Sequence, residues 1–255
     1  MKRWIAVVLM VLVGVARAQT APATRPTTMR TDLDPTVAAE KQGRDGKPDA
    51  GFVVRHTRYV ERAKKGDVGL LFLGDSITQG WEGQKQIWED SFGKSKPPNF
   101  GIGGDRTQHV LWRIENGELE GIKPKVAVIM IGTNNAGGDP ADKIAEGVEK
   151  IVKETREKTG AKILLFAIFP RGQDPKNGPK AQDTAMLRAK IAQVNERISK
   201  MDDGKDIKYM DIGDKFLEPD GTIKPTIMRD YLHLTKEGYQ RWADAIKPAL
   251  EEMMK

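Results

Sequence analysis

The sequence predicts an α/β fold in which a parallel sheet of about five strands carries helices on both faces. Short apolar runs alternate with amphipathic segments along the body of the chain, as expected for parallel strands joined by helical crossovers. The run over residues 126–132 is apolar throughout, which is typical of a strand buried on both faces. We find no internal repeat and no second domain boundary, so residues 51–255 are expected to form one domain.

Five strands and the helices between them account for most of this body. The predicted strands cover residues 70–74, 99–104, 126–132, 163–169 and 207–212. The predicted helices cover residues 52–66, 87–92, 107–119, 140–158, 181–201 and 235–253. The longer helices carry apolar residues at intervals of three and four, as an amphipathic helix requires. Pro170 stops the fourth strand, because proline cannot donate to a ladder, and a polar loop is expected over residues 171–180.

Residues 1–18 have the three parts of a secretory signal peptide. Two basic residues precede an apolar run over residues 5–15, and an Ala-x-Ala pattern ends at Ala18. The apolar run is too short for a comfortable membrane span. We expect cleavage after Ala18 and a secreted or periplasmic product without a stable membrane span, with an uncleaved N-terminal anchor as the alternative.

The composition restricts the remaining possibilities. The chain has no cysteine, which excludes disulfides, a thiol nucleophile and lipid attachment at a signal-sequence cysteine. The formal charge of +6 falls to +3 without the leader, and the remaining basic residues are interspersed with acidic ones, so nucleic-acid binding is not expected. Residues 19–50 are rich in Pro, Thr, Ala and charge, and we expect a linker or an extended N-terminal arm.

Three strand ends carry the residues with chemical potential. The first strand ends in Gly74-Asp75-Ser76, the second in Gly103-Gly104 and the third in Thr133-Asn134. If the first and third strands are neighbours and the second lies beside the first, all three ends face one cleft at the carboxyl edge of the sheet. Ser76 is then a candidate nucleophile, although a serine at this position can also simply cap the following helix. The N–H groups of Ser76 and Gly104 and the amide of Asn134 are candidate donors for an oxyanion.

A serine nucleophile needs a base, and the chain has three histidines. His233 lies in a loop before the last helix, three residues after Asp230, whose carboxylate is suited to orient the imidazole. The alternative is that Asp230 and His233 make only a local loop hydrogen bond. His56 falls in the first helix as a surface or packing residue, and His109 lies one turn into the helix after Gly104, where it caps or packs.

These residues resemble the four ordered blocks of the SGNH (GDSL-type) esterases. The match is closest to the branch that contains the catalytic subunits of platelet-activating factor acetylhydrolase Ib and their bacterial relatives. Besides Asp230-x-x-His233, the segments that carry it are Gly74-Asp75-Ser76-Ile77, Asn99-Phe100-Gly101-Ile102-Gly103-Gly104-Asp105, His109-Val110-Leu111-Trp112-Arg113, Asn116-Gly117-Glu118-Leu119-Glu120, Ile122-Lys123-Pro124-Lys125-Val126 and Gly132-Thr133-Asn134-Asn135.

The resemblance implies a three-layer, flavodoxin-like fold and assigns a role to each site residue. Ser76 is implied as the nucleophile, His233 as the base and Asp230 as its orienting partner, with Gly104 and Asn134 in the oxyanion hole. The export signal, the stretch at residues 81–86 and the loop at residues 171–180 depart from that branch, so the family's lipid substrate is not carried over.

We therefore expect an exported serine esterase that removes short acyl groups, acetyl foremost, from a carbohydrate. A lipid acetylhydrolase or lysophospholipase is the alternative within the same chemistry. A non-catalytic carbohydrate-binding module and a nucleotide or flavin binder, suggested by the glycines at 101, 103 and 104, are the alternatives outside it. The expected partner is a small-molecule or carbohydrate ester, and a homodimer stays open. No metal or cofactor is expected, because the acidic residues and histidines lack ligand spacing.

Overall fold

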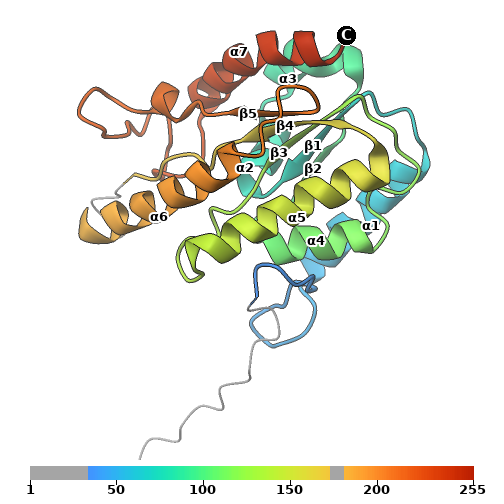
Figure 1. Ribbon diagram of the computed structural model, residues 1–255, viewed down its shortest axis with the longest axis horizontal. Helices are drawn as coiled ribbons and strands as arrows, with labels where there is room; N and C mark the ends of the chain where they lie inside the picture. Colours follow the sequence, from blue (N-terminus) through green and yellow to red (C-terminus); the bar gives the residue numbers. More distant parts are fainter. Residues whose placement is uncertain (1–33, 173–180) are drawn as a thin grey trace, which may run out of the picture.

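A parallel five-stranded sheet lies at the centre of the protein (Figure 1), as seen in a computed structural model that describes residues 34–172 and 181–255. The strands are β1 (Leu70–Gly74), β2 (Asn99–Gly101), β3 (Val126–Met130), β4 (Lys162–Phe166) and β5 (Ile207–Met210). Their order across the sheet is β2-β1-β3-β4-β5, and every pair is parallel. The predicted fold class and the expected neighbours of the first strand are confirmed.

Helices connect and flank the strands. The α-helices are α1 (Ala50–Lys64), α2 (Ser76–Gln79), α3 (Lys85–Phe92), α4 (Thr107–Glu115), α5 (Ala141–Thr159), α6 (Ala181–Ser199) and α7 (Lys236–Met253). Three short 3-10 helices are η1 (Gly80–Gly83), η2 (Gly93–Ser95) and η3 (Gly213–Phe216).

Alternate residues of each strand point into two separate apolar cores, because successive side chains of a strand face opposite sides. Leu71 and Leu73 of β1 pack with residues of α1, α4, α5 and α6 in one core. Leu70 and Phe72 pack with residues of α3 and α7 in the other. Figure 1 shows α3 and α7 on one side of the sheet and α1, α4 and α5 on the opposite side. The sheet is thus covered on both faces, which leaves its carboxyl edge to carry a site.

Every predicted strand except the first ends two or three residues before its predicted limit, and the helices α1, α4 and α6 end two to four residues before theirs. The fourth strand ends at Phe166 rather than residue 169, because the amide of Asn195 takes both main-chain groups of Ile168, at 2.8 and 3.0 Å. Helix α4 ends at Glu115 rather than residue 119, because the Asn116 side chain donates to the Trp112 carbonyl (2.8 Å) and Gly117 follows with φ of +92°. At Ile168 a side-chain amide takes the place of the backbone partners of a strand, whereas the Trp112 carbonyl keeps its helical bond from the Asn116 N–H and gains the side chain as a second donor.

Residues 34–49 lie against the domain. Thr107 Oγ1 donates to the Pro35 carbonyl (2.8 Å), and the N–H of Ala39 donates to the Gln108 carbonyl (3.1 Å). This part of the predicted arm is therefore attached to α4. The predicted leader at 1–18 and residues 173–180 of the predicted polar loop lie outside the described residues.

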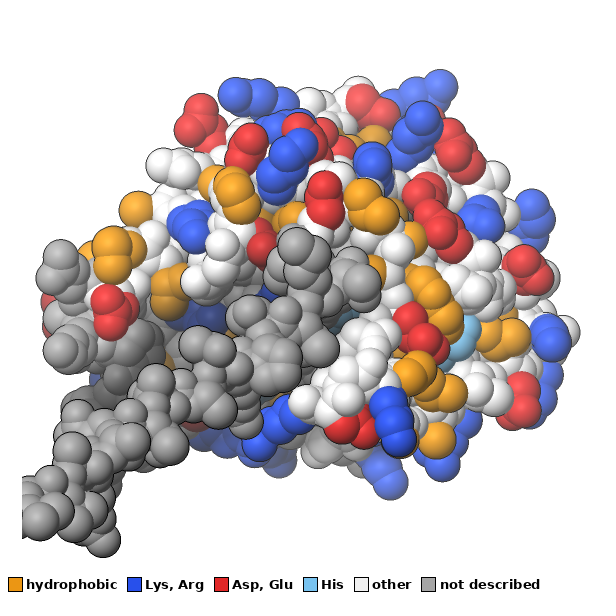
Figure 2. All heavy atoms as spheres, turned by 90° about the horizontal axis from the view of Figure 1, so that it is seen from below, with side chains coloured by type: hydrophobic (Ala, Val, Ile, Leu, Met, Phe, Trp, Pro, Cys, Tyr) orange, Lys and Arg blue, Asp and Glu red, His pale blue; other side chains and the backbone are white. Residues whose placement is uncertain are grey.

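Basic and acidic side chains are interspersed over the face shown in Figure 2, without a large patch of one sign. Across the described ranges, no helix is both long and apolar enough to cross a membrane.

Candidate active site

Ser76 follows the carboxyl end of β1 and is the first residue of α2. Asp75 caps α2 by accepting from the Ile77 N–H (2.9 Å), so the chain turns abruptly and leaves the half-buried Ser76 at the edge of the sheet. This turn packs closely against the end of β2. A Cβ added to Gly101 would lie 2.2 Å from the Gln79 N atom, so only glycine fits there.

The structure brings Ser76, His233 and Asp230 together. Ser76 Oγ lies 2.9 Å from His233 Nε2, and His233 Nδ1 lies 2.7 Å from Asp230 Oδ2. The other Asp230 oxygen accepts from the main-chain N–H groups of His233 (2.7 Å) and Leu232 (3.2 Å). These contacts fix the carboxylate, which in turn orients the ring so that Nε2 faces the serine.

The loop that carries Asp230 and His233 is closed upon itself. Met228 and Leu234 form an antiparallel bridge, and the N–H of Arg229 donates to the His233 carbonyl (3.1 Å). Tyr231 at its tip has φ of +61°, a conformation that side-chain-bearing residues rarely adopt, and its carbonyl accepts from the Gly172 N–H (2.8 Å). The geometry of the Asp-His pair is thus set mainly within one short loop.

The Gly103-Gly104 turn lies beside the serine. A Cβ built on Gly103 would be 3.8 Å from Ser76 Cβ, and the N–H of Gly103 donates to Gln79 Oε1 (2.7 Å). Gly104 is exposed and has φ of +73°, which favours glycine. Gly104, the residue expected in the oxyanion hole, therefore lies at the surface. Its neighbour Gly103 is the residue that approaches Ser76.

Asn134 follows β3 and is half-buried. Its Nδ2 donates to the Asp105 carbonyl (2.9 Å), which joins the end of the third strand to the Gly103-Gly104 turn. An amide nitrogen carries two hydrogens, so this contact leaves one for a ligand. Arg171, which the sequence did not single out, lies on the same edge. It interacts electrostatically with Asp230 and Asp75, and its Nη1 is 3.5 Å from the Thr133 carbonyl.

A cavity of about 380 Å3 opens beside Ser76 and His233. Its walls come from the segment after Ser76 and from the histidine loop. The polar side chains among them belong to Gln79, Glu82, Gln84 and Arg229, and the apolar contributions come from Leu234 and Tyr239. Glu82 is held by two contacts from Arg55 of α1, at 2.7 and 3.2 Å. This cavity presents polar and apolar surface in about equal measure to a ligand at the serine, and four of its side chains besides Ser76 and His233 are polar.

Two carboxyl groups of the site have displaced pKa values in opposite directions. Burial raises the pKa of Asp75 to about 7, and the nearby Asp105 adds to the shift. Burial also acts to raise the pKa of Asp230, but hydrogen bonds from His233 and Leu232 outweigh it and lower that pKa overall. Asp230 is therefore ionised at neutral pH, as a partner of an imidazolium must be.

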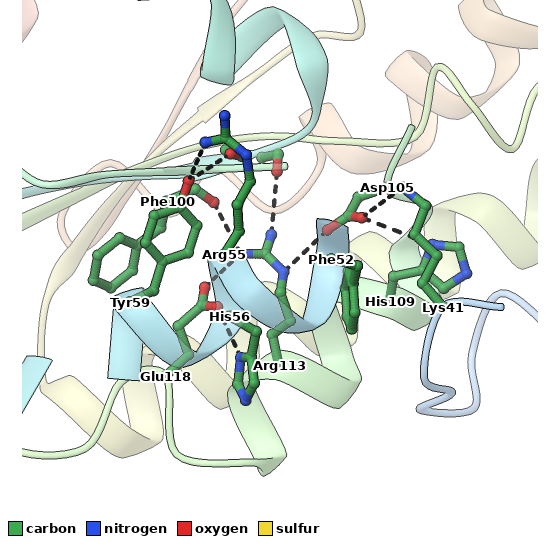
Figure 3. A network of polar contacts seen from close by, with 12 residues as sticks. Lys41, Phe52, Arg55, His56, Tyr59, Phe100, Asp105, His109, Arg113 and Glu118 are labelled. Atoms are coloured by element: carbon green, nitrogen blue, oxygen red, sulfur yellow. Dashed lines mark hydrogen bonds and ion pairs between the residues drawn. The ribbon is translucent and has the colours of Figure 1, made fainter. Parts of the chain in front are cut away.

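A buried ionic cluster stands behind the Gly103-Gly104 turn (Figure 3). Arg113 of α4 is fully buried, with Nε 3.0 Å from Asp105 Oδ2 and Nη1 2.5 Å from Glu118 Oε1. It also donates to the carbonyls of Phe100 (2.9 Å) and Gly74 (3.2 Å) at the ends of β2 and β1. The cluster therefore fixes the carboxyl ends of two strands to one helix.

The other two histidines lie around this cluster rather than at Ser76. His56 is buried, with Nδ1 3.3 Å from Glu118 Oε2. His109 is buried too, and its Nδ1 accepts from the N–H of Arg106 (3.1 Å) at the start of α4. His233 is the histidine that the structure brings to the serine.

The GDSL-like Lipase/Acylhydrolase family model matches residues 72–241, which include Ser76, Asp230 and His233. The chain is similar to human platelet-activating factor acetylhydrolase IB subunit alpha1, with 39% identity over 207 residues that make up 80% of this chain and 83% of that protein. The match thus covers more than four fifths of that relative.

Two solved structures share the fold at lower identity. A GDSL-like lipase from Bacteroides thetaiotaomicron superposes with a TM-score of 0.61 and 21% identity, covering 77% of this chain and 97% of that one. An acetyl xylan esterase superposes with a TM-score of 0.56 and 24% identity, covering 71% of this chain and 98% of that one. At these identities the likeness concerns the fold.

Proposed function

The chain belongs to the GDSL-like lipase/acylhydrolase family, whose members hydrolyse esters, and from this premise we propose that it is an exported serine acetylesterase acting on a carbohydrate. The observation that carries the proposal is the unbroken relay from Ser76 Oγ through His233 to Asp230, with distances of 2.9 and 2.7 Å. A serine that served only as a helix cap would not need an oriented imidazole at its oxygen.

In the first half-reaction, Ser76 Oγ attacks the carbonyl carbon of the acetyl ester while His233 Nε2 takes the hydroxyl proton. The carbonyl oxygen becomes an oxyanion held by the N–H groups of Ser76 and Gly104 and by the amide of Asn134. When the tetrahedral intermediate collapses, the bond to the alcohol oxygen breaks and His233 returns the proton to it. The products of this step are the free alcohol and acetyl-Ser76.

In the second half-reaction, water attacks acetyl-Ser76 as His233 takes a proton from it. Collapse of the second tetrahedral intermediate breaks the bond to Ser76 Oγ, which regains its proton from His233, and acetate leaves. Asp230 stabilises the imidazolium in both steps without taking the proton itself.

The cavity beside Ser76 supports a short acyl group and a polar alcohol. A long alkyl chain lying against Gln84 and Arg229 would desolvate these groups without giving them partners, at a cost of roughly 1–3 kcal/mol for each. Sugar hydroxyls instead supply both donors and acceptors for carboxylate, amide and guanidinium groups. An acetyl xylan esterase with the same fold is consistent with this substrate class.

A lipid ester is the competing substrate, because the chain resembles platelet-activating factor acetylhydrolase subunits at 39% identity. Both substrates carry an acetyl group, and they differ in the alcohol. The leader-like residues 1–18 favour an extracellular substrate, which supports the carbohydrate.

The test is a panel of p-nitrophenyl acetate, butyrate and octanoate run beside acetylated xylan and an acetylated ether phospholipid. We expect the acetate to be the best aryl ester and acetylated xylan to release acetate faster than the phospholipid. Faster hydrolysis of the octanoate would contradict the short-chain assignment, and faster hydrolysis of the phospholipid would contradict the carbohydrate. Ser76→Ala is the control that must be inactive on all of them.

A further inference from the structure

We infer that Lys41, in the segment before α1, is a positioning residue of the oxyanion hole, because it holds and polarises the peptide unit between Gly103 and Gly104. The inference rests on the proposed esterase function and adds a residue that lies outside the four family blocks. Lys41 does not contact Ser76 or His233, and it acts through the main chain of the turn beside them.

The contacts of Lys41 are directed at this turn. Its Nζ donates to the Gly103 carbonyl and lies 3.4 Å from Asp105 Oδ1. A Cβ built on Gly104 would be 3.1 Å from the same nitrogen, so the ammonium group lies directly against the turn. Figure 3 shows Lys41 beside Asp105, with Arg113 on the other side of that carboxylate.

The planarity of the peptide bond makes this contact relevant to catalysis. The Gly103 carbonyl and the Gly104 N–H belong to one trans peptide unit, so they point in opposite directions. An ammonium group that fixes the carbonyl on one side therefore fixes the direction of the N–H on the other. The same charge draws electron density toward the carbonyl oxygen, which makes the N–H a stronger donor.

The neighbouring peptide units have other anchors. The N–H of Gly103 donates to Gln79 Oε1 (2.7 Å), and the N–H of Asp105 donates to the Ile102 carbonyl (3.1 Å). The Asp105 carbonyl accepts from Asn134 Nδ2 (2.9 Å). Gly104 itself has φ of +73° and no side chain to restrict it. The peptide unit between Gly103 and Gly104 is held by none of these contacts, and Lys41 anchors it through the Gly103 carbonyl.

Asp105 has two cationic partners, Arg113 inside the cluster and Lys41 at its margin. That carboxylate already has Arg113 Nε at 3.0 Å, and both side chains are fully buried. The Lys41 side chain, by contrast, is 16% exposed and lies at the margin of the cluster. Removing its charge should therefore perturb the turn more than the packing of the core.

The backbone of the segment brings Lys41 to this place. The N–H of Asp49 donates to the Lys41 carbonyl (2.8 Å), Gln42 and Pro48 form an antiparallel bridge, and Ala39 is bound to the Gln108 carbonyl. Residues 39–49 thus form a closed loop fastened to α4. What the sequence predicts as a linker or arm contributes a residue to the site at this point.

The experiment compares Lys41→Met, which keeps the stem and removes the charge, with Lys41→Arg, which keeps a cationic donor. Lys47→Met is the matched control, since Lys47 is an exposed lysine on the same segment. We measure kcat and KM on p-nitrophenyl acetate, the midpoint of thermal unfolding, and the amide proton shift of Gly104 in 15N-labelled protein.

We expect Lys41→Met to lower kcat by about tenfold, less than the loss of a direct oxyanion donor, with KM within about twofold. Lys41→Arg should recover most of that loss, Lys47→Met should match the wild type, and the Gly104 amide proton should move upfield in Lys41→Met. The thermal midpoint should change little.

A kcat of Lys41→Met within about twofold of the wild type would overturn the inference, as would a rise in KM alone. If the wild type hydrolyses no ester, the proposed function fails. The Gly104 resonance then still tests Lys41, because an unmoved resonance shows that the lysine does not polarise this peptide.

Discussion

The two sides of the candidate site are built in different ways. On the base side, Asp230 and His233 are held by hydrogen bonds within one short loop, and their side chains are 46% and 29% exposed. On the oxyanion side, the turn at Gly103-Gly104 rests on Arg113 and Asp105, which are fully buried and connect elements far apart in the sequence.

The difference follows from what each side does in the proposed reaction. The imidazole must accept a proton and deliver it to two different oxygens, so a local loop that orients the ring is sufficient. Oxyanion donors are effective only when they already point at the place where charge develops, which requires a rigid support. The buried cluster of Arg113 and Asp105 supplies that support on the oxyanion side. The loop that carries Asp230 and His233 is held by its own hydrogen bonds instead.

The largest effect is expected from the base side. His233→Ala should lower kcat by about 10⁶-fold on p-nitrophenyl acetate, because Ser76 then has no group to take its proton. Since the partly exposed ring contributes little packing, the thermal midpoint should stay near that of the wild type. A variant that keeps a tenth of the wild-type kcat would show that His233 is not the base.

The oxyanion side should instead show its largest effect in stability. Arg113→Met removes the partner of the buried Asp105 and Glu118 carboxylates, and we expect a loss of about 3–5 kcal/mol in the free energy of unfolding by urea. The matched control is Arg241→Met, whose exposed pair with Glu237 should be worth at most about 0.5 kcal/mol. Similar losses in both variants would contradict the contrast between the two sides.

Asn134→Ala should separate catalysis from stability on the oxyanion side. It removes one proposed oxyanion donor, and we expect kcat to fall by about 100- to 1000-fold with a smaller change in KM. The contact with the Asp105 carbonyl is lost as well, but the cluster behind it remains, so the fold should persist. Unchanged turnover in a folded variant would remove Asn134 from the oxyanion hole.

The smallest effect concerns pH. Burial raises the pKa of Asp75 to about 7 and that of Asp105 to about 6, whereas an unfolded aspartate titrates near 4. Between these values the folded state holds more protons than the unfolded state, so both groups make stability fall as the pH rises toward 7.

Asp75→Asn removes the titratable carboxyl group at this position, while the amide oxygen of the new side chain can still accept from the Ile77 N–H and cap α2. Urea unfolding at pH 5, 6 and 7 should show a decline that is smaller in Asp75→Asn than in the wild type, by roughly 2 kcal/mol over the range. Parallel curves for the two proteins would contradict the raised pKa of Asp75.

The fold and the pairing of Asp230 with His233 could be predicted because their signals are local, whereas the meeting of His233 with Ser76, across 157 residues, was implied by the family resemblance. Apolar runs mark the buried strands, and the residues that follow them must meet at the carboxyl edge of a parallel sheet. The Asp230-x-x-His233 spacing places two partners within one loop, where a hydrogen bond needs no distant element.

Lys41, Gln79 and Arg171 could not be predicted in the same way. Lys41 reaches the Gly103 carbonyl across 62 residues of sequence, and Gln79 reaches the Gly103 N–H across 24. Which lysine or glutamine makes such a contact depends on the packed backbone, and the charge-rich composition of residues 19–50 pointed to a solvated arm instead. The early end of β4 at Phe166 has the same origin, because it depends on Asn195 of α6.

Ser76 is the proposed nucleophile of this serine esterase. The most direct measurement is reaction with a fluorophosphonate followed by intact mass and peptide mapping. We predict a single adduct, on Ser76, absent in Ser76→Ala and formed much more slowly in His233→Ala. An adduct on another residue, or equal labelling of Ser76→Ala, would contradict it.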